Sequence, residues 1–142
     1  MTDDQAGPED SHLEEKRADV YRPWLEAARH CDYVGVPTYS RSIVARYASK
    51  ATKVPIIVTE DGIAAEDDTR RVEYFQRALA GLKRAIDDGV RGYVAWALMD
   101  NFERMLGLTP KFGLVAVDVK TQKRTIKPSA AMLGNIARRN AL

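Results

Sequence analysis

The chain has 142 residues, of which 22 are basic and 20 are acidic, and its formal net charge is +2. This length is sufficient for one domain with a hydrophobic core, and 45% hydrophobic residues is ordinary for a globular protein. The nearly balanced charge, without a basic stripe interleaved with aromatic residues, argues against nucleic acid as a partner. No run approaches the roughly 18 apolar residues that a membrane-spanning helix needs, so a membrane is not an expected partner either.

The first ten residues, Met1–Asp10, are acidic and lack the apolar segment of a signal peptide. They predict a disordered tail in front of a single domain over residues 11–142, and a cytoplasmic location. The single cysteine, Cys31, excludes disulfides within the chain. Its neighbours His30 and Asp32 suggest a metal site, but a buried thiol at a helix-to-strand junction is the favoured interpretation. The sequence therefore predicts no metal and no cofactor.

The N-terminal part of the domain is expected to be helical. Ser11 begins a capping-box pattern, and Pro23 either interrupts the resulting helix or starts a second one that reaches His30. In this segment, Trp24 and Leu25 are expected to face a core.

Three apolar segments are typical of strands, and they occupy Asp32–Val36, Pro55–Thr59 and Arg91–Ala97. Helices are predicted between them, over Ser42–Lys50 and Thr69–Asp88. The alternation of strands and helices indicates parallel βαβ units.

The helix Thr69–Asp88 has the clearest pattern, because its apolar residues recur three and four positions apart. This stripe consists of Val72, Phe75, Leu79, Leu82 and Ile86. Beyond the third strand, Leu114–Val119 and Gln122–Ile126 predict a short hairpin, and Pro128–Arg139 predicts a final helix.

The segment Thr59–Gly62, with the sequence Thr-Glu-Asp-Gly, is the most informative feature of the chain. It places the carboxylate of Glu60 directly after a buried strand, and the carboxyl ends of barrel strands carry catalytic groups. Further motifs follow at Gly92–Glu103, Lys111–Val115 and Thr121–Ser129. In this order they resemble the C-terminal part of glycoside hydrolase family 1, the β-glucosidase family. The family pattern is roughly T-E-N-G, G-Y-x-x-W-S-L-x-D-N-F-E-W, R-F-G-L and R-x-x-K-x-S, and the resemblance extends from about Tyr33 to the C-terminus.

The resemblance implies an α/β fold, the C-terminal portion of a (β/α)8 TIM barrel. A complete barrel takes about 250 residues, so this chain is expected to form an incomplete one with about three parallel strands and outer helices. Family members carry their general acid in an Asn-Glu-Pro motif, which does not occur in this sequence. The expected function is that of the nucleophile-bearing part of a retaining β-glucosidase, without the half that carries the general acid.

The resemblance also assigns roles to individual residues. Glu60 matches the family nucleophile, and Tyr39 matches a tyrosine that orients it. Trp96 and Glu103 match sugar-binding positions, and Phe112 matches a residue of the pocket wall. The alternatives are structural: a solvated strand-end carboxylate for Glu60, core packing for the three aromatic residues, and a loop charge for Glu103.

Five positions depart from the family pattern. Asp61 replaces an asparagine and adds a negative charge beside the candidate nucleophile. Pro37 replaces an asparagine, Ala97 a serine, Arg104 a tryptophan and Lys111 an arginine. Together these changes indicate relaxed constraint or an altered substrate.

Three hypotheses about function stay open at this point. The chain is part of a β-glycosidase that another chain completes, or a truncated, non-catalytic remnant with at most weak sugar binding. The third possibility is a half-barrel whose open sheet edges pair with a second copy. The expected partners are thus a β-glycoside or sugar, and either a homo-oligomer or a complementing N-terminal barrel fragment. The isolated chain is expected to be inactive or very weak.

Overall fold

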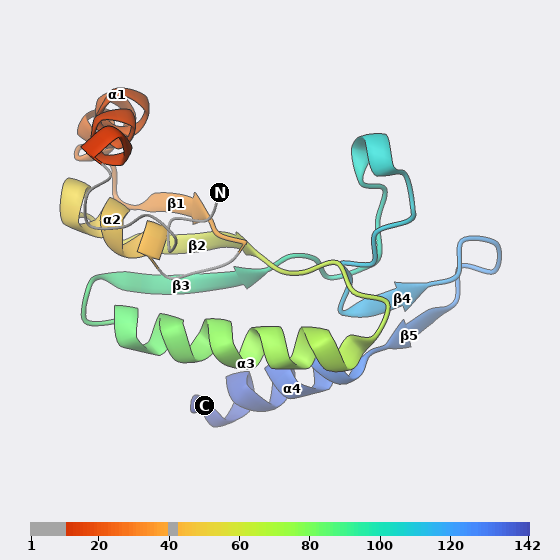
Figure 1. The fold of residues 1–142 in the computed structure, drawn as a ribbon. Coiled ribbons are helices and arrows are strands. Elements are labelled where there is room, and N and C mark those ends of the chain that lie inside the picture. Colours follow the sequence, from red (N-terminus) through yellow and green to blue (C-terminus); the bar gives the residue numbers. More distant parts are fainter. Residues whose placement is uncertain (1–10, 40–42) are drawn as a thin grey trace.

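The computed structural model describes the backbone of residues 11–39 and 43–142, and the side chains of residues 20–39 and 44–142 (Figure 1). The tail predicted over Met1–Asp10 lies outside the described residues, as does Ser42.

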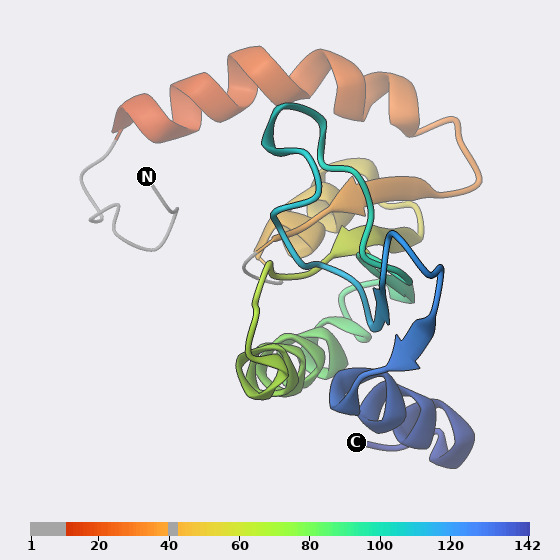
Figure 2. The ribbon, with the colours of Figure 1, turned by 90° about the vertical axis from the view of Figure 1, so that its right-hand side faces the viewer.

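Three strands form one parallel sheet in the order β1-β2-β3. Their bounds are Val34–Pro37 for β1, Ile56–Asp61 for β2 and Val90–Ala95 for β3. The predicted strands are confirmed, with ends that differ by one or two residues. The described strands do not close into a barrel, so β1 and β3 are both edge strands. Figure 2 looks onto the carboxyl ends of this sheet.

In the described part of the chain, four α-helices accompany the sheet: α1 (Ser11–Ala28), α2 (Ile43–Thr52), α3 (Asp68–Ala85) and α4 (Pro128–Arg139). Figure 1 shows α3 and α4 together along one side of the sheet, whereas α1 and α2 lie beside β1. The buried core joins the sheet to α2 and α3 and consists of Val36, Ala45, Ala48, Ile56, Val58, Ala85 and Val90. One face of the sheet is therefore covered by helices, as in the outer layer of a β/α barrel.

The N-terminal helix differs from the prediction in two ways. α1 is one helix from Ser11 to Ala28 with Pro23 inside it, so the expected break or restart is wrong. A proline removes only one backbone donor, and the helix continues beyond it. Trp24 does not face a core, because 77% of its surface is exposed; α1 lies beyond the sheet edge, and only Leu25 packs against the core. Cys31 is likewise exposed rather than buried.

The helix α3 buries Phe75 and Leu79 as the apolar stripe predicts. It ends at Ala85, and Ile86 is consequently half-exposed rather than part of the buried stripe. Asp67 caps its first turn by accepting a hydrogen bond from the Thr69 backbone N–H at 2.9 Å.

The C-terminal elements follow the prediction. β4 (Val115–Val117) and β5 (Arg124–Ile126) form an antiparallel hairpin, and α4 has the predicted bounds. Between β3 and β4, a long loop with a short 3-10 turn, η2 (Arg104–Leu106), projects from the carboxyl end of the sheet (Figure 2). None of the helices in the described part of the chain is long and apolar enough to cross a membrane.

Candidate active site

Two strand ends bring the first pair of predicted site residues together. The Tyr39 hydroxyl, just beyond β1, donates a hydrogen bond of 2.6 Å to Oε2 of Glu60 in β2. The backbone supports this contact, because the Thr38 N–H donates to the Glu60 carbonyl oxygen at 2.6 Å. The register shifts between Val36 and Pro37, which sets Pro37 opposite Glu60. The sequence prediction that Tyr39 lies against Glu60 therefore agrees with the geometry.

The Tyr39 hydroxyl is held in its protonated form. Burial raises the pKa of Tyr39 to about 12, together with the hydrogen bond to Glu60 and the charges of Glu60, Glu103 and Asp61. At neutral pH this group therefore acts as a donor to the Glu60 carboxylate. The same interactions show that three carboxylates lie within electrostatic reach of one hydroxyl.

A second pair forms at the end of β3. The Trp96 indole Nε1 donates to Oε1 of Glu103 over 3.3 Å. Glu103 comes from the long loop, where its backbone N–H donates to the Gly107 carbonyl oxygen at 2.7 Å and closes a tight turn. Both residues are half-buried. Their polar atoms are thus fixed at the carboxyl end of the sheet, on which Glu60 also lies.

Phe112 lies next to this second pair. Its carbonyl oxygen accepts a hydrogen bond from the Ala97 N–H at 3.3 Å, immediately after Trp96, and the residue is half-buried. A phenyl side chain makes no hydrogen bond that would indicate a role. The structure therefore places Phe112 beside the candidate site and assigns no function to it.

Asp61 has surroundings unlike those of Glu60, although the two residues are adjacent. It is only 3% exposed, and Tyr74 from α3 donates to its Oδ1 while Tyr93 from β3 donates to its Oδ2 at 2.8 Å. Burial raises the pKa of Asp61, and the hydrogen bonds from Tyr74, Tyr93 and Thr38 oppose that rise. Burial and the charge of Asp61 raise the pKa values of both tyrosines above their ordinary range.

Sequence reasoning did not identify Tyr74 and Tyr93 as partners of the site. Tyr74 lies outside the apolar stripe of α3, and Tyr93 stands in the Gly-Tyr motif of the third strand. The only available signal was residue type, because a tyrosine hydroxyl can donate to a buried carboxylate at the end of a strand. The described residues contain no group of three or more His, Cys, Asp or Glu side chains that could hold a metal.

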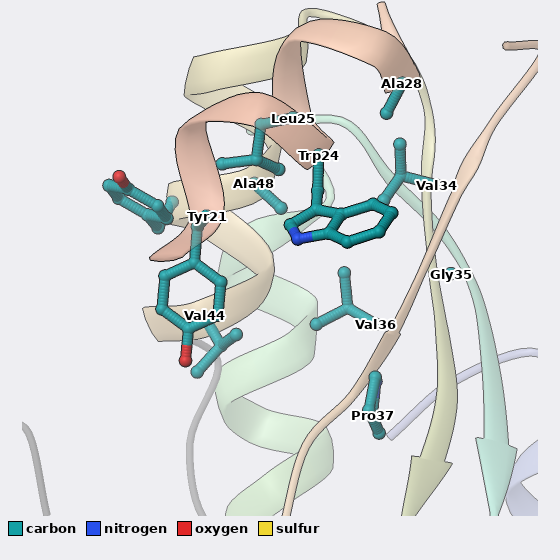
Figure 3. Close-up of a pocket in the computed structure, with 11 residues that line it drawn as sticks. Tyr21, Trp24, Leu25, Ala28, Val34, Gly35, Val36, Pro37, Val44 and Ala48 are labelled. Atoms are coloured by element: carbon teal, nitrogen blue, oxygen red, sulfur yellow. The ribbon is translucent and has the colours of Figure 1, made fainter. Parts of the chain in front are cut away.

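A separate apolar groove of about 430 Å³ runs along β1 between α1 and α2. Figure 3 shows the Trp24 indole above Val36 and Pro37, with Leu25 and Val44 nearby. All four residues of β1 line this groove, and neither Glu60 nor any other candidate site residue does. The groove belongs to the open edge of the sheet rather than to the carboxylate site.

Comparison with protein families gives a match to the model described as "Glycosyl hydrolase family 1" over residues 2–142. Among curated proteins, Beta-glucosidase 42 from Arabidopsis thaliana is 43% identical over 98 residues, which are 60% of this chain and 20% of that protein. The bifunctional beta-D-glucosidase/beta-D-fucosidase of Bifidobacterium breve is 42% identical over 91 residues, 54% of this chain and 20% of the relative.

Solved structures agree over a larger part of the chain. The β-glycosidase BGL167 is 38% identical with a TM-score of 0.86, over 94% of this chain and 39% of that one. The hyperthermophilic β-glucosidase from Pyrococcus furiosus is 26% identical with a TM-score of 0.85, over 97% of this chain and 40% of that one. The chain thus spans about a fifth of these curated relatives and about two fifths of these solved structures, and its fold is a portion of their TIM barrel.

Proposed function

The chain belongs to glycosyl hydrolase family 1, and we propose that it supplies the nucleophile and part of the sugar-binding site of a retaining β-glucosidase. The observation that carries the proposal is the hydrogen bond of 2.6 Å from Tyr39 to Oε2 of Glu60. Among the described side chains it engages only Oε2, which leaves Oε1 for attack on a sugar in this proposal.

In this proposal Glu60 attacks the anomeric carbon and forms an ester bond to it as the bond to the aglycone oxygen breaks. A general acid protonates the departing oxygen, and water then hydrolyses the ester and restores the carboxylate. Tyr39 donates to Glu60 in the free site, which fixes the direction of the attacking oxygen. Its raised pKa, about 12, keeps that proton in place at neutral pH.

Trp96 and Glu103 would hold the sugar. A carboxylate can accept hydrogen bonds from two neighbouring hydroxyls, and such charge-assisted bonds are among the stronger ones. The Trp96 N–H already donates to Oε1 of Glu103 and orients the carboxylate. In the proposal, the indole face would stack on a pyranose ring. Phe112 would contribute to the wall of the same pocket.

The general acid would come from elsewhere. The resemblance locates it in an Asn-Glu-Pro motif, which is absent from these 142 residues. General acid catalysis contributes about 10²–10⁴-fold to the rate, so the chain alone is expected to leave unactivated β-glucosides nearly untouched.

The open edge of β1 supports a partner that continues the barrel. The N–H groups of Val34 and Thr38 donate to the carbonyl oxygens of Pro55 and Glu60, on the side of β1 that faces β2. Because the backbone groups of a parallel strand alternate in direction, the N–H and C=O groups of Gly35 point away from β2, toward the open edge. An unpaired edge with an apolar groove beside it is suited to receiving another strand. We propose an N-terminal barrel fragment as the first candidate for this strand.

The test is turnover of cellobiose and of an aryl β-glucoside by the chain alone and after mixing with an N-terminal barrel fragment of a relative. The mixture is expected to be active on both substrates, and Glu60→Gln should abolish that activity. Cellobiose turnover near 10 s⁻¹, about the median for enzymes, by the pure chain would contradict the need for a partner.

A second candidate function is self-association without catalysis. It is favoured by apolar side chains that the described structure leaves in solvent, including Trp24 at 77%, Leu98 at 67% and Met105 at 100% exposure. Sedimentation velocity distinguishes the two candidates. Concentration-dependent dimers that an N-terminal fragment does not dissociate support this second candidate, and a stable monomer at high micromolar concentration excludes it.

A further inference from the structure

Asp61 is a buried ionisable group that the proposed chemistry does not use. It ends β2, directly after Glu60, and is 3% exposed. No ion pair among the described residues involves it; its carboxylate instead accepts from the hydroxyls of Tyr74, Tyr93 and Thr38. An unpaired buried carboxylate is costly unless hydrogen bonds satisfy it, so this arrangement requires an explanation.

The backbone at Asp61 is equally constrained. Its carbonyl oxygen accepts a hydrogen bond of 2.8 Å from the Trp96 N–H, and the pairing of β2 with β3 shifts register between Val58 and Asp61. At Gly62 a Cβ atom would lie 1.9 Å from the Trp96 carbonyl oxygen, so the two strand ends touch. Asp61 therefore joins the segment that carries Glu60 to the segment that carries Trp96.

A register shift breaks the simple alternation of side chains along a strand. The direction of Glu60 is then not set by β-pairing alone and depends on what fixes the next residue. Tyr74 fixes Asp61 to α3 and Tyr93 fixes it to β3, each through a different carboxylate oxygen.

We infer that Asp61 is a positioning residue, which holds the end of β2 through Tyr74 and Tyr93 so that Glu60 meets Tyr39. This inference rests on the proposed role of Glu60 as the nucleophile. The requirement is for two acceptor oxygens, which a carboxylate has, whereas an asparagine offers one acceptor and an amide donor. The carboxylate at a position where the family pattern has asparagine is thus matched to the hydroxyls of Tyr74 and Tyr93.

The charges around the pair are consistent with this assignment. Asp61 accepts from the hydroxyls of Tyr74, Tyr93 and Thr38, and the charges that raise the pKa of Tyr39 are those of Glu60, Glu103 and Asp61 itself. Burial raises the pKa of Asp61, while all three hydroxyls favour its ionised form by donating to it.

The test measures the contact between Tyr39 and Glu60 directly, without any sugar. In the 142-residue chain labelled with [13Cζ]tyrosine, the Tyr39 resonance is assigned by its loss in Tyr39→Phe. Glu60→Gln gives the resonance position that corresponds to an altered hydrogen bond. Asp61→Asn is expected to move the resonance toward that position while circular dichroism shows a folded chain.

Two further variants separate positioning from general damage. Adding Tyr74→Phe to Asp61→Asn removes the surplus donor and should return the Tyr39 resonance toward its wild-type position. Asp67→Asn removes a charge from the exposed cap of α3 and should leave the resonance unchanged. If Asp61→Asn does not fold, Tyr93→Phe, which removes one of the two anchors, is expected to move the resonance in the same direction.

A folded Asp61→Asn chain with an unmoved Tyr39 resonance would overturn the inference, as would a failure of Tyr74→Phe to restore a shifted one. If Tyr93→Phe is used in place of Asp61→Asn, an unmoved Tyr39 resonance would likewise overturn the inference. If the resonances behave as expected but Glu60 is never glycosylated, the proposed function fails while the positioning contact stands.

Discussion

Glu60 and Asp61 are adjacent in the sequence but enter two different regions of the molecule. Glu60 is half-buried and accepts from the hydroxyl of Tyr39, a residue that is 47% exposed, at the open end of the sheet. Asp61 is buried and bound to two tyrosines from a helix and a neighbouring strand. The difference shows that two adjacent carboxylates at one strand end have different surroundings: Glu60 lies in an accessible site, and Asp61 is a buried anchor.

The buried region extends along α3 to a second aspartate. Asp68 accepts from the backbone N–H and the hydroxyl of Ser129 at 2.7 and 2.9 Å and pairs with Arg71, which is fully buried. Arg71 also donates to the carbonyl oxygens of Ala65, at 2.8 Å, and Lys111. These contacts bind the first turns of α3 and α4 to the loop segment that leads into Phe112. We call Asp61, Asp68 and the residues that they contact through hydrogen bonds or ion pairs the anchor region.

The largest expected effect comes from Arg71→Met. Breaking a buried ion pair by removing one partner costs about 3–5 kcal/mol, because Asp68 and two carbonyl oxygens lose their donor. Unfolding in urea measures this loss of stability. Arg70→Met is the matched control, since Arg70 is exposed, and it should change stability by less than about 0.5 kcal/mol. Equal effects at both positions would show that Arg71 is not an anchor.

A smaller effect is expected from Asp61→Ala. It leaves the Tyr74 and Tyr93 hydroxyls without their acceptor, and a buried unsatisfied group costs about 1–3 kcal/mol. Glu60→Ala removes the acceptor of one hydroxyl, on Tyr39, which as a residue is 47% exposed, and should cost less. If Glu60→Ala were the more destabilising of the two in urea, the division between an accessible site and a buried anchor would be wrong.

The pH dependence of stability should separate Asp61 from Asp68. Burial places the pKa of Asp61 above its ordinary 3.8, so its contribution is fully present below that value and is lost as pH rises through the folded-state pKa. Burial would also raise the pKa of Asp68, but the hydrogen bonds from Ser129 and the contact with Arg71 outweigh it and lower that pKa. The contribution of Asp68 is thus present above 3.8 and is lost as the pH falls.

Urea unfolding at several pH values tests both signs. In the wild-type chain, Asp61 makes the free energy of unfolding fall as the pH rises, and Asp68 makes it fall as the pH drops. Asp61→Asn should remove the first of these dependences, and Asp68→Asn should remove the second. Parallel pH profiles for the two variants would contradict the assigned directions.

The smallest effect on stability is expected from Tyr39→Phe, within about 0.5 kcal/mol, because the side chain is 47% exposed. The same variant should slow glycosylation of Glu60, since it removes the donor that orients the carboxylate. Urea unfolding and the rate of covalent labelling give the two readouts. A large loss of stability with unchanged labelling would assign Tyr39 to the anchor region instead.

The sequence predicts those features that depend on local pattern or on a recognisable motif. The three parallel strands, the hairpin and the bounds of α4 follow from apolar periodicity and turn residues. The contact between Tyr39 and Glu60 is predicted by the resemblance, in which Tyr39 matches the tyrosine that orients the nucleophile.

Features that depend on the arrangement of elements in space were missed. The exposure of Trp24 follows from the position of α1 beyond an open sheet edge, which periodicity does not encode. The anchors of Asp61 come from α3 and β3, 13 and 32 residues away, and meet at a register shift that no local pattern specifies. Such convergence is visible only when the strands are placed side by side.

The central claim is that Glu60 is the nucleophile, and covalent labelling tests it most directly. A 2-deoxy-2-fluoro glucoside with a dinitrophenolate leaving group needs no acid for departure, so attack by Glu60 should give a long-lived glycosyl ester. The chain is treated with this reagent together with an N-terminal barrel fragment and analysed by intact mass and peptide mapping. The account predicts one adduct on Glu60 that is absent from Glu60→Gln. A stoichiometric adduct on Asp61, Asp100 or Glu103 instead would contradict it.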